Sequence, residues 1–287
     1  GGTFIKMALV NDKGVVQSRA KIPTKDAVGL DAWMDAVAKG LEQLKGKKDA
    51  GELAGIGVGV PGFVDYERGF IYDLANVPGW TGVHLAAQLE KRFNVHVRID
   101  NDVNVMALGE CTFGAGRAYQ HAVFVTLGTG VGGGLLVNNK LYRGAFSMAG
   151  EIGHMSINMD GIKSPQGRGG LEQYVGNRRI VERAVKLLEQ GRQSLIRDMV
   201  KGDWSAITPE VIGQAANKGD KLAIEVYDFV ADCLAAAFAS VTYLIQPQAF
   251  IVGGGVAQSG SILFDPLRKH LGERLSPFFA ERIEVKT

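Results

Sequence analysis

The sequence predicts a two-domain α/β protein with mixed sheets and a cleft between the domains, and three observations support this prediction. Segments of strand and helix character alternate along the 287 residues, which is typical of largely parallel sheets covered by helices. Residues 1–13 match residues 128–140 at five of thirteen positions, with a shift of 127. Each of these segments also contains a turn of glycine and threonine. The alternative to an internal repeat is chance similarity between two hairpins.

The first half supplies strands and helices in alternation. Alternating apolar residues predict a hairpin over residues 4–20. Apolar residues at helical spacing predict a helix over 31–45. A nearly unbroken apolar strand over 53–60, a helix over 84–93 and a short strand over 95–99 are expected to follow.

The second half repeats this alternation. Thr208 is expected to cap a helix whose first residue is Pro209, a position that tolerates proline. The expected elements are a strand over 122–126, a glycine loop over 128–134, a hairpin over 134–142, helices over 171–190, 209–217 and about 220–245, a strand over 250–252 and a glycine loop over 253–255.

Composition and charge exclude several classes of protein. Hydrophobic residues make up 46% of the chain and charged residues 22%, which is the balance of an ordinary globular protein. The 32 basic and 30 acidic residues are mixed along the chain, without the basic stripe of a nucleic-acid-binding protein. Cys111 and Cys233 lie far apart in sequence, so we expect no disulfide framework and a reducing, cytoplasmic location.

An uncharged run over residues 233–264 raises the question of a membrane span. Gln246, Pro247 and Gln248 interrupt this run and leave 13 residues before them. A spanning helix needs about 20 apolar residues. The sequence therefore predicts a buried helix followed by a buried strand, and no membrane association.

The two glycine–threonine turns have the chemistry of a phosphate site. Gly2-Thr3 and Gly128-Thr129-Gly130 offer backbone N–H groups and hydroxyls, which suit phosphate oxygens. Either turn alone is also typical of an ordinary hairpin. Neither continues as Gly-Lys-Ser/Thr, so a Walker loop is excluded. Two similar domains that each offer such a turn to a shared cleft are the plan of the actin-like (ribonuclease H-like) phosphotransferases.

A polar cluster, Asp100-Asn101-Asp102-Val103-Asn104, lies at a predicted junction between a strand and a helix. Four polar residues among five are more than a helix cap needs. A carboxylate here could accept the proton of a sugar hydroxyl while ATP supplies the phosphoryl group. The alternative is that the cluster serves only as a helix cap.

A second polar group combines Glu151 and His154, three residues apart and flanked by glycines, with Glu172 further along the chain. The spacing allows the first two side chains to point the same way. Flanking glycines and nearby carboxylates favour a ligand with several hydroxyls. The alternative is a histidine whose ring is satisfied within the core.

Six motifs, taken in order, resemble those of the ROK family (repressors, open reading frames, sugar kinases), and the resemblance covers the whole chain. The motifs lie at residues 1–6, 57–62, 100–104, 127–134, 150–154 and 253–255. The resemblance implies the actin-like two-domain ATPase fold and phosphoryl transfer from ATP and Mg²⁺ to a hexose hydroxyl. The expected acceptor is O6 of glucose.

The resemblance also implies a role for each matching residue. Asp102 matches the catalytic base. The sugar-binding residues that it implies are Gly62, Asn101, Asp102, Glu151, His154 and Glu172. The nucleotide-binding residues that it implies are Gly2, Thr3, Lys6, Gly128, Thr129, Gly130 and Gly254.

The chain departs from the family's pattern at a metal site. Many members bind zinc through the motif's histidine and three cysteines, but the corresponding places here hold Lys163, Pro165 and Gly170. We therefore expect no structural zinc. The family's aspartate that helps to hold Mg²⁺ precedes residue 1, and its last helix follows residue 287, so both ends are expected to be trimmed.

Together these patterns predict a glucokinase-like enzyme of carbohydrate metabolism and glycolysis. The expected organisation is a smaller N-terminal domain over 1–103, a larger C-terminal domain over 104–287, and a homodimer. The expected partners are a sugar and ATP, without nucleic acid or membrane. Alternatives of the same chemistry are N-acetylmannosamine, mannose or fructose as acceptor and polyphosphate as donor. Alternatives of another class are a sugar-responsive repressor, against which the intact Asp102 argues, and a sugar-binding module without turnover.

Overall fold

The computed structural model describes residues 4–46, 52–74 and 79–287. The chain forms two compact units, which we describe separately. Unit 1 comprises residues up to 109 together with 143–148, and unit 2 comprises 110–142 and 149–287. The first boundary lies within helix α3 (Asp102–Phe113), which also contains the boundary expected from the sequence between residues 103 and 104.

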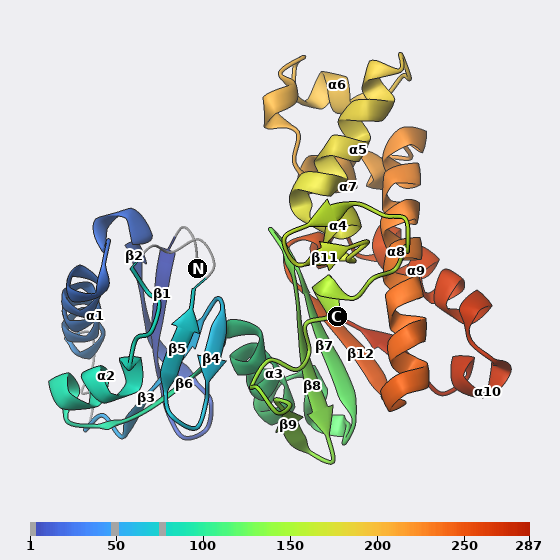
Figure 1. Cartoon of the computed structure of the whole chain (residues 1–287). Helices are drawn as coiled ribbons and strands as arrows, with labels where there is room; N and C mark the ends of the chain where they lie inside the picture. Colours follow the sequence, from blue (N-terminus) through green and yellow to red (C-terminus); the bar gives the residue numbers. More distant parts are fainter. Residues whose placement is uncertain (1–3, 47–51, 75–78) are drawn as a thin grey trace. The chain divides into compact units, whose positions relative to one another are not determined.

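The strands of unit 1 pair two by two. Strand β1 (Phe4–Val10) forms an antiparallel hairpin with β2 (Val16–Pro23). Strand β4 (Phe63–Asp65) forms a second antiparallel hairpin with β5 (Phe70–Asp73). Strand β3 (Gly55–Val60) pairs in parallel with β6 (His96–Asn101). Helix α1 (Leu30–Lys45) packs on β1 and β2, and α2 (Leu85–Phe93) packs on β6 (Figure 1). Parallel pairing places the end of β3 beside the end of β6, where the polar cluster begins.

The core of unit 1 explains why these helices form where they do. Buried residues of α1 recur at helical spacing, and Met34 joins a cluster with Leu85 and Leu89 of α2 and Ile99 of β6. Helix α2 ends at Phe93 and is followed by its cap residue Asn94, whose φ of 52° is the left-handed conformation that commonly terminates helices. This cluster holds β6 and therefore the polar residues that follow it.

Unit 2 contains a five-stranded mixed sheet. Its order is β13 (Glu284–Lys286), β12 (Ala249–Gly253), β7 (Ala122–Leu127), β8 (Val131–Val137) and β9 (Lys140–Tyr142). The first three strands are parallel and the last two are antiparallel to their neighbours. Because β7 and β12 are adjacent and parallel, Leu127 and Gly253 lie at the same edge of the sheet.

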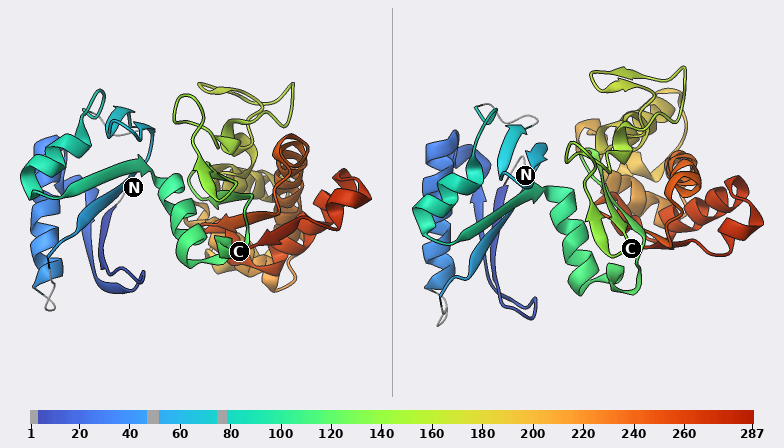
Figure 2. Two further views of the ribbon diagram at one scale, coloured as in Figure 1. Left: turned by 90° about the horizontal axis from the view of Figure 1, so that it is seen from below. Right: turned by 60° about the horizontal axis from the view of Figure 1, so that its bottom comes forward.

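Helices α8 (Lys221–Ile245) and α9 (Ser261–Arg274), drawn in orange to red, lie side by side in both views of Figure 2. Phe238 of α8 stacks on Phe250 of β12 with 4.1 Å between ring centroids, which ties the helix to the sheet. The remaining elements of unit 2 are β10 (Lys163–Ser164), β11 (Gly167–Arg168), α4 (Glu172–Val175), α5 (Asn177–Glu189), α6 (Leu195–Met199), α7 (Pro209–Asn217) and α10 (Pro277–Ala280), with single 3₁₀ turns between some of them.

Helix α8 is long and apolar enough to cross a bilayer, and no other helix in the described ranges is. In its most apolar window 56% of the residues are buried inside the protein, so one such helix is weak support for a membrane span. The helix ends at Ile245 and is followed by β12, as the interrupted uncharged run predicted.

The sequence located most of these elements. Thr208 caps α7 by accepting a hydrogen bond from the N–H of Val211, which confirms that prediction. The glycine loop expected over 128–134 was wrong, because β8 already begins at Val131. Gly133 lies so close to the carbonyl of Gly150 that a Cβ atom would collide with it. Glycine therefore serves close backbone approach here rather than a turn.

The single helix expected over 171–190 was also wrong. It is divided into α4 and α5 by Gly176, whose φ of −65° and ψ of 150° are extended. A Cβ atom on Gly176 would lie only 3.1 Å from the carbonyl oxygen of Thr129. The break lets the start of α5 approach the turn between β7 and β8.

The proposed repeat coincides with a pair of strands. Strand β8 begins and ends 127 residues after β1 does, and the same shift aligns the two sequence segments. Each of the two strands forms the first arm of a hairpin, with β2 and β9 respectively.

Candidate active site

The polar cluster lies where β6 passes into α3, and its residues have different surroundings. Asn101 is the helix cap, because its Oδ1 atom accepts hydrogen bonds from the N–H groups of Val103 (2.9 Å) and Asn104 (3.4 Å). Asp102 is the first residue of α3 and is exposed. Within the described part of the chain its side chain has no hydrogen bond or ion pair. The cap and the free carboxylate are therefore separate residues.

Gly62 lies beside this junction. Its carbonyl oxygen accepts a hydrogen bond from Nδ2 of Asn101 at 3.2 Å. The φ of Gly62 is 135°, and a Cβ atom there would collide with the carbonyl of Asp73, so only glycine fits. The structure thus brings together three of the predicted residues, Gly62, Asn101 and Asp102, within unit 1.

Glu151 and His154 lie at a 3₁₀ turn of unit 2 that spans Ile152–His154. His154 Nε2 and Glu151 Oε2 are 3.6 Å apart, and their side chains are 33% and 40% exposed. Ile152 and Gly153 between them are buried and anchor the turn. The two polar side chains therefore point the same way, as their spacing suggested, and the histidine is not enclosed in the core.

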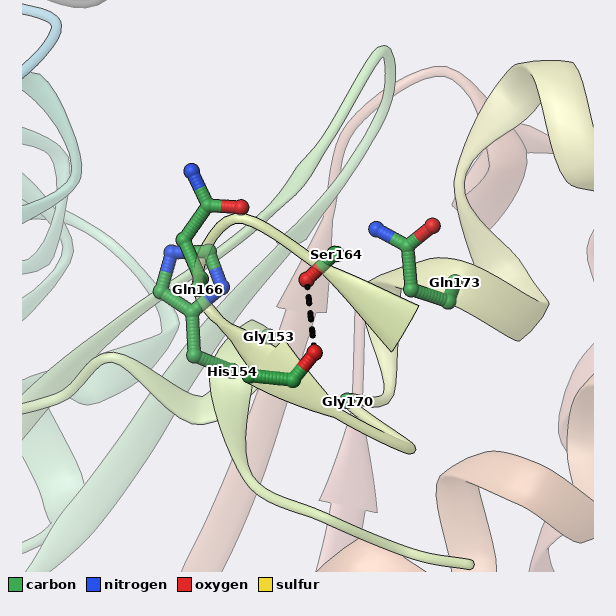
Figure 3. Close-up of a pocket in the computed structure, with 7 residues that line it drawn as sticks. Gly153, His154, Ser164, Gln166, Gly170 and Gln173 are labelled. Atoms are coloured by element: carbon green, nitrogen blue, oxygen red, sulfur yellow. Dashed lines mark hydrogen bonds between the residues drawn. The ribbon is translucent and has the colours of Figure 1, made fainter. Parts of the chain in front are cut away.

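A shallow depression that is open to solvent adjoins His154. In Figure 3 the imidazole of His154 and the amide of Gln166 lie on one side of it, and Gln173 reaches in from α4 on the other. The remaining lining residues are Gly153, Ser164, Gly167 and Gly170. Amides, a hydroxyl and an imidazole are groups that both donate and accept hydrogen bonds, which suits a polar ligand.

The expected phosphate turn of unit 2 joins β7 to β8. The N–H of Gly128 donates to the carbonyl of Gly130 (3.0 Å), and the N–H of Asn177 donates to the carbonyl of Gly128 (2.9 Å). Asn177 is the first residue of α5, so the turn lies at the N-terminus of a 13-residue helix, where anions are favoured. Glu172 also reaches this turn, since its Oε2 atom accepts from the N–H of Val131 at 2.9 Å.

Gly254, predicted to contact the adenosine, follows β12. Its φ is 95°, and a Cβ atom there would collide with the backbone of Leu127, the last residue of β7. This glycine therefore lies next to the turn at Gly128. Of the other predicted nucleotide residues, Gly2 and Thr3 are outside the described residues. Lys6 is exposed on β1 without a partner among the residues described.

The residues near His154 do not fit a zinc site. Lys163, Pro165 and Gly170 stand where three thiolates would be needed, and within the described ranges no group of three His, Cys, Asp or Glu side chains could hold a metal. The loop is instead held by hydrogen bonds. The N–H of Ile162 donates to the hydroxyl of Tyr174 (3.2 Å), and the N–H of Leu171 donates to the carbonyl of Met155 (3.0 Å). No pattern in the sequence points to Tyr174.

The mixed α/β units, with a glycine–threonine turn where one strand ends beside a helix N-terminus, define a protein of the actin-like ATPase fold. A model of the ROK family matches residues 1–286, and the chain belongs to this family.

Three known proteins illustrate this membership. Glucokinase of Thermotoga maritima is 31% identical over 285 residues, which cover 99% of this chain and 89% of that enzyme. The xylose repressor of Caldicellulosiruptor bescii is 32% identical over 236 residues, which cover 81% of this chain and 58% of the repressor. The crystal structure of a ROK family glucokinase from Streptomyces griseus, in complex with glucose and AMPPNP, superposes with a TM-score of 0.85 at 30% identity, covering 100% of this chain and 91% of that one.

Proposed function

We propose that this protein is an ATP-dependent hexose kinase that transfers the γ-phosphoryl group of ATP to O6 of glucose. The observation that carries the proposal is the exposed and unpartnered carboxylate of Asp102, which the described residues leave available beside the cap formed by Asn101. The glucokinase from Thermotoga maritima and the glucose- and AMPPNP-bound enzyme from Streptomyces griseus support the choice of acceptor and donor.

In this mechanism Asp102 acts as the general base. Its carboxylate accepts the proton of the attacking hydroxyl while a bond forms between O6 and the γ-phosphorus. The bond from that phosphorus to the β–γ bridging oxygen breaks, and ADP leaves with the electron pair. Glucose 6-phosphate, ADP and one proton result. Because such transfer is loose and needs little covalent help, the protein acts mainly by positioning and electrostatics.

The proposed sugar ligands are groups that can form hydrogen bonds with hydroxyls. They are Gly62, Asn101, Glu151, His154 and Glu172. Carboxylates and an imidazole can pair with hydroxyls of one stereochemistry, and a wrong sugar would leave them unpaired. That cost is the proposed source of specificity among hexoses.

The proposed nucleotide residues include the turn of Gly128, Thr129 and Gly130, where the start of α5 favours the charge of phosphate, and the neighbouring Gly254. Mg²⁺, when bound with ATP, would neutralise charge on the phosphates. The described residues offer no cage of three ligating side chains, which is compatible with an ion held largely by phosphates and water.

A coupled assay of ADP release over a panel of hexoses tests the function directly. We expect turnover with glucose to exceed that with mannose, fructose and N-acetylmannosamine, and ATP to be a better donor than polyphosphate. Sugar binding without ADP release from any hexose would contradict a kinase and favour a repressor or a binding module. The homodimer and the cytoplasmic location remain predictions, and light scattering of the purified protein tests the former.

A further inference from the structure

Arg143 makes a close ion pair with Asp100, the residue before Asn101. The Nε and Nη2 atoms of Arg143 both donate to Oδ2 of Asp100, at 2.9 and 2.7 Å. Arg143 directly follows β9, and it belongs to the short segment 143–148 that returns to unit 1. Both members of the pair therefore lie in unit 1, although 43 residues separate them in sequence.

Asp100 is buried, and each of its two carboxylate oxygens accepts two hydrogen bonds. Its side chain is only 9% exposed, and Oδ1 accepts from the N–H of Asn101 (2.8 Å) and from Nδ2 of Asn104 (2.9 Å). A buried carboxylate needs a counter-charge, because removal from water costs far more than a single neutral hydrogen bond returns. In the described part of the chain Arg143 is the only cation paired with it.

The guanidinium of Arg143 is itself fixed by an aromatic ring. Its central carbon lies 3.8 Å from the ring centroid of Tyr66, within the range of a cation–π contact. Tyr66 follows β4, the strand that begins next to Gly62. Gly62 accepts a hydrogen bond from the side chain of Asn101, so residues on both sides of β4 contact the cluster or its counter-ion.

We infer that Arg143 is a positioning residue for phosphoryl transfer. It acts through Asp100, whose carboxylate fixes the N–H of Asn101 and the side chain of Asn104 on either side of Asp102. It touches no reacting atom in this role. The inference rests on the proposed function, because positioning matters only if Asp102 is the base. Lysine cannot reproduce the role fully, since it lacks the planar fork that gives two bonds to one carboxylate and stacks on a ring.

A double-mutant cycle between Arg143→Gln and Asp102→Asn tests this inference. If Arg143 acts through Asp102, Arg143→Gln should lower kcat by about 10²-fold in the wild-type background, the scale of a displaced catalytic group. In the Asp102→Asn background the same change should cost less than about threefold, because there is no base left to position. The KM for ATP should change little in either background.

Controls separate positioning from folding. Arg92→Gln removes an exposed ion pair with Asp35 in the same unit, at 2.7 Å, and should leave kcat unchanged. If Arg143→Gln does not fold, two further variants replace it: Arg143→Lys, and Asp100→Asn combined with Arg143→Gln, which removes both charges. Each should fold and still lose at least about tenfold in kcat.

Two outcomes would overturn the inference. One is a kcat within about twofold of wild type in folded Arg143 variants. The other is a loss of kcat in the Arg143→Gln, Asp102→Asn double variant that equals the product of the two single-variant losses. Absence of hexose phosphorylation by the wild-type protein would instead contradict the proposed function. The two failures are therefore distinguishable.

Discussion

Glu172 accepts a hydrogen bond from the N–H of Val131 at 2.9 Å. A carboxylate predicted to bind the sugar is therefore hydrogen-bonded to the turn predicted to bind phosphate. Gly130 lies directly against this carboxylate, and a Cβ atom there would contact it at 2.5 Å. The sequence assigned the two groups to separate ligands. Their contact couples the position of the carboxylate to that of the turn.

This contact predicts an unusual kinetic result for Glu172. Glu172→Ala should raise the KM for ATP as well as that for glucose, each by about tenfold, the scale of one lost charged hydrogen bond. Glu172→Gln keeps an oxygen that can accept from Val131 and should affect mainly glucose. Glu151→Gln is the matched control and should raise only the KM for glucose. Steady-state kinetics decide, and an unchanged KM for ATP in Glu172→Ala would contradict the prediction.

Asp102→Asn should lower kcat by at least about 10²-fold, because it preserves shape and removes the proton acceptor. Glucose binding measured by calorimetry should stay within a few-fold of wild type. Asp31→Asn is a matched control, since Asp31 also lies in the first turn of a helix, α1. Near-normal turnover of Asp102→Asn would show that Asp102 only interacts with the helix dipole.

Two neighbouring glycines give a paired test of the predicted adenosine site. Gly254→Ala should lower stability and raise the KM for ATP, because its φ is 95° and the new Cβ would strike the backbone of Leu127. Gly255→Ala has open space around it and helical φ and ψ, so it should behave like wild type. Thermal unfolding and ATP kinetics measure both effects. Equal behaviour of the two variants would argue against this arrangement.

Purified protein should contain far less than one zinc ion per chain, and activity lost to a chelator should return with excess Mg²⁺. The loop over residues 155–170 should be stabilised by its hydrogen bond to Tyr174 and not by a metal ion. Tyr174→Phe removes the hydroxyl that accepts from Ile162, a bond worth about 1 kcal/mol. Hydrogen exchange in residues 155–170 should accelerate while exchange in α8 stays unchanged. Stoichiometric zinc would refute the prediction.

Burial, with a smaller effect from Asp232, raises the pKa of the Cys233 thiol to about 12. The value in the unfolded chain is near 9.0, so between pH 9 and about 12 unfolding releases a proton that the native protein retains. The associated stability is complete below pH 9 and is lost as the pH rises towards 12, by about 1.4 kcal/mol per pH unit.

Cys233→Ala should therefore show a shallower loss of stability above pH 9 than wild type, measured by denaturant unfolding. Thiol labelling at pH 8 offers a second measurement. Cys233 should react only after unfolding, whereas half-buried Cys111 should react slowly in the native protein. Rapid labelling of both native thiols would contradict this.

Local chemistry made much of the fold predictable. The helical spacing in α1, the cap at Thr208 and the polar interruption after Ile245 each act over a few residues, and each gave the right element. Glycine was harder, because Gly133 lies within a strand and Gly176 divides a helix. Both serve contacts with residues distant in sequence, which periodicity does not register.

The residues of the polar cluster locate it in the chain, but they do not by themselves decide which of its two aspartates has a free side chain; only the family resemblance pointed to Asp102. Asp100 and Asp102 are chemically identical and two residues apart. Burial and an arginine 43 residues away decide which one is free. No sequence pattern near the polar cluster identifies Arg143 as the partner of Asp100. No pattern in residues 155–170 identifies the hydroxyl of Tyr174 as a hydrogen-bond partner of that loop.

The return of residues 143–148 to unit 1 has a consequence for biosynthesis. A ribosome delivers the chain from its N-terminus, so Asp100 emerges well before its counter-ion Arg143. Until Arg143 has been synthesised, the carboxylate of Asp100 must stay hydrated, so the end of β6 cannot become buried. The N-terminal unit therefore cannot finish folding as an independent nascent domain. It must wait until β7, β8 and β9 of the second unit have been synthesised.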